Sequence, residues 1–184
     1  MQHIQWKLRE AAFYLHNMKE HSAKLFASVG PLRFEWTNPQ HAQAAQVFLF
    51  LLSAFIGAFG CVTYYMETSC DKNSSAKRWF KRARKKAVRE HSALAAFAYL
   101  RNSDVHERHI AAGASTWHTV NMAEQTTSSE FRLSEKELKM MEKLQEQPWA
   151  IDLLKDRPIV ALAEDALKEL GAVVNEGVGL GHLP

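Results

Sequence analysis

Hydrophobic and polar positions alternate with a helical period in the N-terminal part of the chain. Apolar or small side chains recur every three or four residues, at Leu8, Ala11, Leu15, Met18, Ser22, Leu25 and Val29. This spacing places them on one stripe of an α-helix, and Gly30-Pro31 ends the pattern. The sequence therefore predicts an amphipathic helix over residues 5–28.

The next segment is far more apolar. Thr37-Asn38-Pro39 supplies a helix cap and a first-turn proline, which predicts a helix over residues 39–67. Residues 47–66 carry no charge, and their length would suffice to cross a bilayer. Small or polar residues such as Ser53 and Gly57 interrupt the apolar surface, and a helix surrounded by other helices is also apolar all round. We therefore expect residues 47–66 to be largely buried, with no membrane as partner, and keep a membrane-anchored helical protein as the alternative.

The pattern then predicts a third helix over residues 76–101, with Ser75 as its cap. The polar run at residues 102–104 should end it, because Asn, Ser and Asp side chains compete for backbone hydrogen bonds. A short fourth helix is expected over residues 104–112. Residues 114–130, rich in Ser and Thr without a helical period, predict a loop or a short strand.

Two C-terminal helices complete the expected set. Ser134 and Glu137 form a capping box before a helix over residues 135–146, and Pro158 opens a helix over residues 158–174. The chain has 184 residues, a length that fits one domain. We expect a single all-α domain over residues 1–184, with its core at about 5–112 and a helical extension at about 131–175.

Charge is unevenly distributed along the chain. The net charge is only +3. A dense basic run nevertheless occupies residues 77–89, and its cations suit RNA phosphates because neutralising them releases counterions. A solvated helix face is the alternative. The candidate RNA-binding residues are Lys77, Arg78, Lys81, Arg82, Lys85 and Lys86.

The two cysteines and the N-terminus bear on the cellular compartment. Cys61 and Cys70 form no CxxC pair, which predicts neither a disulfide framework nor a zinc site. The N-terminus carries charges where a signal peptide would be apolar. We therefore expect a cytoplasmic protein.

Arg101 and His106 stand in an R-x4-H spacing. On a continuous helix, residues five apart point about 140° away from each other, so their side chains would not meet. The expected break at residues 102–104 would let both face one cleft. A neutral histidine beside a guanidinium could then act on a phosphodiester, with the histidine moving protons and the arginine holding phosphate oxygens.

With this motif, Arg101-Asn102-Ser103-Asp104-Val105-His106, the chain resembles the HEPN superfamily of all-helical domains. The apolar second helix and the basic KRWFKRA segment follow the order seen in that family, over about residues 5–112. The resemblance implies an antiparallel four-helix bundle with additional C-terminal helices. It also implies a homodimer in which both copies bring Arg101 and His106 to a shared cleft, with Asn102 orienting them.

The activity implied is that of a metal-independent endoribonuclease without cofactors, often a toxin or defence component held by an inhibitory antitoxin-like partner. Cleavage would proceed by attack of a 2′-hydroxyl on the adjacent phosphorus. The alternative is a non-catalytic HEPN-like module that binds RNA, nucleotide or a protein partner, because a fold does not confer activity. We expect His109 to be a solvated histidine, His91 to be structural, and Trp36, Trp79 and Phe80 to pack in the core.

Overall fold

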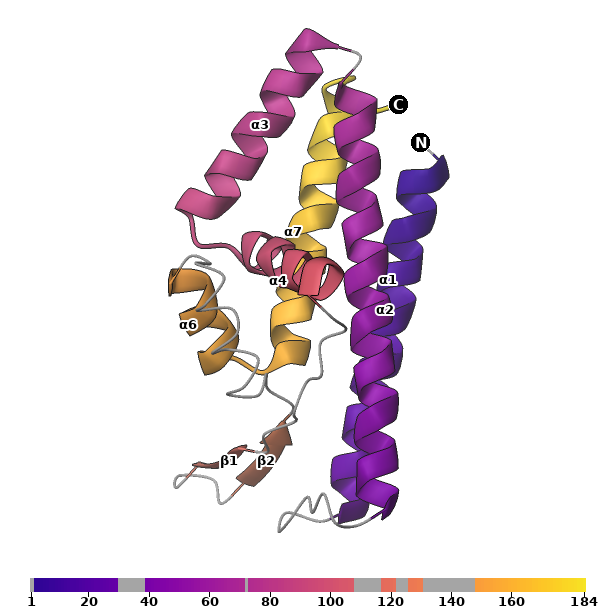
Figure 1. Cartoon of the computed structure of the whole chain (residues 1–184), viewed down its shortest axis with the longest axis vertical. Coiled ribbons are helices and arrows are strands. Elements are labelled where there is room, and N and C mark those ends of the chain that lie inside the picture. Colours follow the sequence, from indigo (N-terminus) through magenta and orange to yellow (C-terminus); the bar gives the residue numbers. More distant parts are fainter. Residues whose placement is uncertain (1, 30–38, 72, 108–116, 122–125, 131–147) are drawn as a thin grey trace.

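The computed structural model describes residues 2–29, 39–71, 73–107, 117–121, 126–130 and 148–184. These residues form six helices and one antiparallel hairpin (Figure 1). The helices are α1 (Gln2–Val29), α2 (Pro39–Cys70), α3 (Ser74–Arg89), α4 (Ala93–Glu107), α6 (Pro148–Asp156) and α7 (Ile159–Gly179), and the strands are β1 (Trp117–Asn121) and β2 (Thr126–Glu130). The all-α class is confirmed. The helix expected over residues 135–146 lies outside the described residues.

A long antiparallel pair, α1 and α2, runs the length of the molecule (Figure 1). The stripe expected on α1 faces inward, with Ala11, Leu15, Met18 and Leu25 all buried. Near one end the His3 ring stacks on Tyr65 at 5.5 Å, and nearer the other His21 Nε2 hydrogen-bonds to the carbonyl of Ala44 at 2.7 Å. The predicted amphipathic helix is therefore confirmed.

The core lies where α2, α4 and α7 meet. Phe97 of α4 packs edge-on against Phe55 of α2 at 5.5 Å and lies 5.9 Å from Phe59. From α7, Leu170 and Val174 are fully buried in the same cluster. The C-terminal helix, expected at 158–174, thus closes the core.

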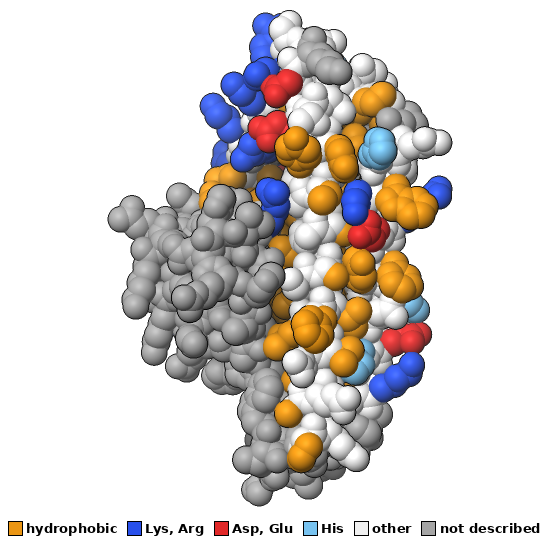
Figure 2. All heavy atoms as spheres, turned by 45° about the vertical axis from the view of Figure 1, so that its right-hand side comes forward, with side chains coloured by type: hydrophobic (Ala, Val, Ile, Leu, Met, Phe, Trp, Pro, Cys, Tyr) orange, Lys and Arg blue, Asp and Glu red, His pale blue; other side chains and the backbone are white. Residues whose placement is uncertain are grey.

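The burial predicted for residues 47–66 is right for one face of α2 and wrong for the other. Phe48, Leu52 and Phe55 are buried, whereas Phe50 is 67% and Tyr64 57% exposed. Figure 2 shows hydrophobic side chains at intervals along the α1–α2 face. The reason is geometric, because α1, α3 and α4 pack against only part of the surface of α2 in the described structure.

Within the described part, α2 is the one helix long and apolar enough to cross a membrane, over Ala42–Cys70. Half of its most apolar window is buried. Core helices of soluble proteins meet the same criterion of length and composition, so the criterion does not distinguish the two cases.

The helical run expected over residues 76–101 breaks at a different place from the one predicted. It is interrupted at Glu90–Ser92, where His91 adopts a left-handed conformation with φ 51°. There the Ser92 N–H donates to the Ala87 carbonyl at 3.0 Å, which closes α3. The expected break at residues 102–104 is absent, because α4 begins at Ala93 and continues through Glu107. The polar residues 102–104 thus extend an established helix, because lengthening a helix is easier than starting one and their helix propensities are only weakly unfavourable.

Three smaller features of the structure also bear on the predictions from the sequence. Asn73, and not Ser75, caps α3, with its Oδ1 accepting from the Ser75 N–H at 2.9 Å. The short strand expected within residues 114–130 is present as a β1–β2 hairpin that pairs Trp117 with Glu130. Helix α6 is not among the expected helices, although Pro148 at its first position is a helix-start signal.

Candidate nucleic-acid interface

Helix α3 carries the basic run and is anchored at its N-terminal end. Trp79 and Phe80 are buried, as expected, and Trp79 Nε1 donates a hydrogen bond to Glu176 of α7 at 3.2 Å. Beyond them the inward positions hold only small residues, Ala83 and Ala87, and the helix slants away from α2 and α7 (Figure 1). Its cationic face is thereby held out from the bundle.

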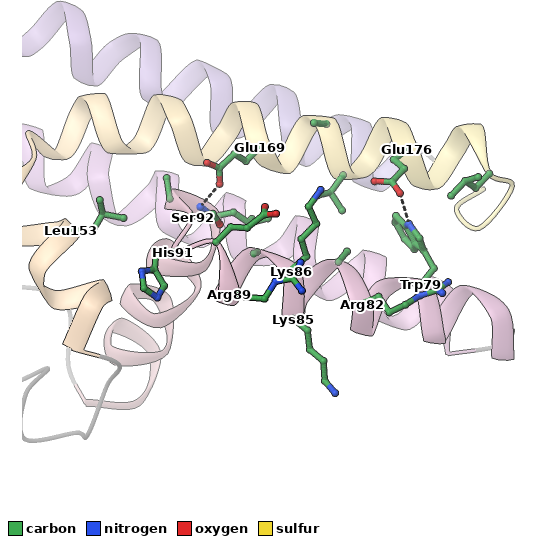
Figure 3. A pocket seen from close by; sticks show the side chains of 18 of the residues that line it. Trp79, Arg82, Lys85, Lys86, Arg89, His91, Ser92, Leu153, Glu169 and Glu176 are labelled. Carbon is green, nitrogen blue, oxygen red and sulfur yellow. Dashed lines mark hydrogen bonds between the residues drawn. The ribbon is translucent and has the colours of Figure 1, made fainter.

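A groove of about 1140 Å³ lies between α3 and α7, with α6 at one end. Arg82, Lys85, Lys86 and Arg89 line it from α3. Each is exposed, and none forms an ion pair within the described part of the chain. Figure 3 shows these cations along α3, with Lys85 pointing away from α7.

The opposite wall of the groove carries two carboxylates that already have structural partners. Glu169 accepts a hydrogen bond from the Leu94 N–H at 2.8 Å, and Glu176 accepts the one from Trp79 (Figure 3). Arg157, also in the lining, pairs with Asp165 at 2.6 Å. Among the basic groups that line the groove in the described structure, the cations of α3 are therefore the ones left available to an anionic ligand.

The six predicted RNA-binding residues all lie exposed on α3, but in different surroundings. Arg82, Lys85 and Lys86 line the groove, and Arg78 and Lys81 border a shallow hollow beside His182. Lys77 instead pairs with Asp71 at 2.8 Å, and its hydrogen bond to this carboxylate raises the pKa of Lys77. Asp71 thus partly offsets the charge of Lys77. Arg89, which is not among the RNA-binding residues predicted from the sequence, lines the groove.

His91 is structural, as expected, but it stands at the end of α3 and not within it. Its ring stacks on Trp149 of α6 at 4.7 Å, with the planes only 7° apart. This contact holds α6 against the α3–α4 junction, at the end of the groove. No signal in the sequence pairs these two residues.

The helix break on which the predicted Arg101–His106 cleft depends is absent. Helix α4 is continuous through both residues, which places them about 140° apart around the helix. Arg101 lies half-buried against α2, where a methyl group added at Gly60 would overlap its side chain. The side chains of Asn102 and His106, and all of His109 and Trp36, lie outside the described residues.

The described residues include no group of three His, Cys, Asp or Glu side chains placed to hold a metal ion. Cys61 and Cys70 are both free thiols. Burial raises the pKa of the Cys70 thiol, as does the neighbouring Asp71.

Comparisons with protein families, with curated proteins and with solved structures each gave no significant match. The resemblance to the HEPN superfamily therefore rests on the motif at residues 101–106 and on the order of the helices.

Proposed function

We propose that the protein binds RNA along α3, with the phosphates held by the cationic wall of the α3–α7 groove. The observation that carries this proposal is the set of four exposed cations without ion-pair partners in the described structure, Arg82, Lys85, Lys86 and Arg89. Arg82, Lys86 and Arg89 follow one another at one per helical turn of about 5.4 Å, with Lys85 beside Lys86, so they form a row that an extended anionic chain can follow. Phosphate neutralisation by such a row releases counterions and drives association.

RNA is the polyanion we favour because an aromatic ring lies beside the cations. His182 at the edge of the hollow formed with Arg78 and Lys81 is tilted against Trp79, with ring centroids 5.6 Å apart. Such rings can stack on unpaired bases while neighbouring cations hold the backbone. This corresponds to the binding-module alternative of the HEPN-like interpretation.

Photo-crosslinking with single-stranded RNA that contains 4-thiouridine tests the location. We expect the crosslinked peptides to come from α3, from the start of α4 and from the C-terminal turn near His182. Crosslinks confined to α1 or α2 would contradict the proposal. Protein with glutamine at Lys81, Arg82, Lys85 and Lys86 should no longer form the crosslinks.

RNA cleavage is the second candidate function, favoured by the Arg101 guanidinium, which has no hydrogen-bond or ion-pair partner in the described part of the chain. Since α4 is continuous, we propose that the cleft combines Arg101 of one copy with His106 of a second copy. The 2′-oxygen would bond to phosphorus as the bond to the 5′-oxygen breaks. His106 would transfer the proton of the 2′-hydroxyl, and Arg101 would stabilise the negative charge that develops on the phosphate oxygens.

A mixing experiment distinguishes this arrangement from a site within one chain. His106→Ala and Arg101→Ala should each reduce cleavage by about 10²- to 10⁴-fold in the presence of EDTA. A mixed dimer of the two variants would retain one intact site, so random mixing should restore about a quarter of the wild-type activity. Wild-type protein that binds RNA without cutting it would leave the binding function alone.

A further inference from the structure

A second, smaller cavity lies beneath α3 and adjoins the groove, because Ala83, Ala87, Leu94 and Val173 line both. It has a volume of about 190 Å³ and is enclosed by α2, α3, α4 and α7. Its walls are mainly apolar, with Met66, Phe80, Ala87, Ala98, Leu170 and Val173 among the residues that line it. Small side chains on α3 and α4 leave this space, because alanines stand where larger residues would fill it.

The cavity opens to solvent between α2 and α3. Tyr64 on one side and Val88 on the other both line it and are both exposed. A small molecule can therefore enter without displacing a helix. The mouth lies on the α2 side of α3, away from the cations of the groove.

Three charged side chains line this cavity, and two of them offset each other. Arg84 lies 3.6 Å from Glu67, within ion-pair distance. Arg101 is half-buried and has no ion-pair or hydrogen-bond partner among the described residues. The described lining thus has a net charge of one positive unit, located on the guanidinium.

Gly60 creates the space for this arginine. A methyl group at position 60 would overlap the Nε and Cδ atoms of Arg101, so the bare backbone of α2 is what lets the side chain lie there. A half-buried guanidinium in apolar surroundings gains most from an anion that can accept two parallel hydrogen bonds.

We propose that this cavity binds a small amphipathic monoanion, an aromatic or branched aliphatic carboxylate, with Arg101 holding the carboxylate. The size follows from the volume, because a cavity of about 150 Å³ accommodates benzene and this one is somewhat larger. The single charge follows from the one unpaired cation in the described lining. The site is independent of the proposed RNA binding along α3 and needs neither nucleic acid nor a second chain, but it uses the same Arg101 as the second candidate function.

Calorimetric titration of the full chain with phenylacetate, without RNA, tests the proposal. Phenylacetate should bind with one site per chain, and the neutral analogue 2-phenylethanol should bind at least about tenfold more weakly, because it lacks the charge-assisted bonds. Arg101→Gln should remove this preference for the anion. Arg9→Gln, which removes an exposed arginine of α1 outside the cavity, should leave it unchanged.

Gly60→Ala provides a second variant that keeps the charge of Arg101. Because the overlapping atoms belong to a flexible side chain, the fold should persist while Arg101 is displaced, and phenylacetate affinity should fall at least about tenfold. Circular dichroism verifies that each variant is folded. The proposal is overturned if phenylacetate fails to bind, if 2-phenylethanol binds equally well, or if folded Arg101→Gln protein keeps the preference.

Discussion

At the scale of single residues, Gly177 allows α7 to approach α3. A Cβ atom at this position would lie 2.5 Å from the Trp79 ring and 2.7 Å from a methyl group of Leu183, too close for either. Both neighbours are buried, so they have little room to move. Trp79 in turn anchors the end of α3, which ties this glycine to the orientation of the cationic helix.

We expect Gly177→Ala to destabilise the protein by about 1–3 kcal/mol, the usual cost of overpacking a filled core. Gly171→Ala is the matched control on the same helix, since a Cβ atom there meets nothing within 4 Å. That substitution should stabilise α7 by about 0.5–1 kcal/mol through helix propensity. Urea unfolding of the two variants checks both values, and equal stabilities would contradict the close packing at Gly177.

At this scale the burial of a side chain can be predicted from the sequence, but its contacts with other helices cannot. The burial predicted for Trp79 and Phe80 is confirmed, because aromatic residues within a basic helix need a buried face. The spacing of Arg101 from His106 draws attention to the arginine, yet its position across Gly60 depends on a glycine of another helix. Long-range packing of this kind leaves no local pattern in the sequence.

At the scale of elements, the junction between α3 and α4 sets the angle of the cationic helix. Ser92 caps α4, because its Oγ accepts a hydrogen bond from the Ala95 N–H at 3.2 Å. The Leu94 N–H, one residue earlier, donates to Glu169 of α7. Together Ser92 and Glu169 satisfy donors that the start of any helix leaves unpaired.

Ser92→Ala should therefore lower the free energy of unfolding by about 1 kcal/mol, the typical cost of removing an N-cap. Ser74→Ala is the control, because Ser74 begins α3 while Asn73 provides the cap there. Thermal or urea denaturation measures the difference. A Ser92→Ala variant as stable as the Ser74→Ala variant would show that the serine does not support the junction.

The elements themselves are largely predictable from the sequence, and their junctions are not. The periodic segments on α1 and α7 form helices as predicted, because their apolar spacing is strong. The break between α3 and α4 escapes prediction because a single left-handed residue, His91, interrupts an otherwise helical pattern. The break expected at residues 102–104 rests on weak propensities alone, and α4 passes through them.

At the scale of the whole molecule, the exposed face of α2 offers a surface for a second copy. Its residues follow a helical stripe with large side chains toward the ends, Phe50 and Tyr64, and Gly57 midway between them. Such a stripe is self-complementary about a two-fold axis at Gly57, which would pair Phe50 of one copy with Tyr64 of the other. We propose this face as the homodimer interface.

Gly57→Arg tests the interface and should leave the fold of the single chain intact, because a Cβ atom at Gly57 meets nothing within 4 Å. The arginine should convert a dimer into a monomer, since a buried unpaired charge is costly at an apolar interface. Gly171→Arg, another open helical position, should leave the dimer intact. Light scattering measures the mass, and a Gly57→Arg protein that is still dimeric would contradict this interface.

The central claim is that the cations of α3 bind RNA phosphates, and the salt dependence of RNA affinity tests it most directly. Fluorescence anisotropy with a labelled single-stranded RNA would compare wild-type protein with a variant carrying glutamine at Lys81, Arg82, Lys85 and Lys86. The control variant carries glutamine at four exposed cations outside α3, namely Arg9, Lys24, Lys155 and Lys168. Both variants therefore differ from the wild type by the same charge.

We expect the α3 variant to bind more weakly and to show a flatter plot of log affinity against log salt. The slope should change by about 0.7 for each phosphate that the variant no longer neutralises, while the control keeps nearly the wild-type slope. If the α3 variant and the control show the same slope as the wild type, the cations of α3 form a solvated helix face and the account is wrong.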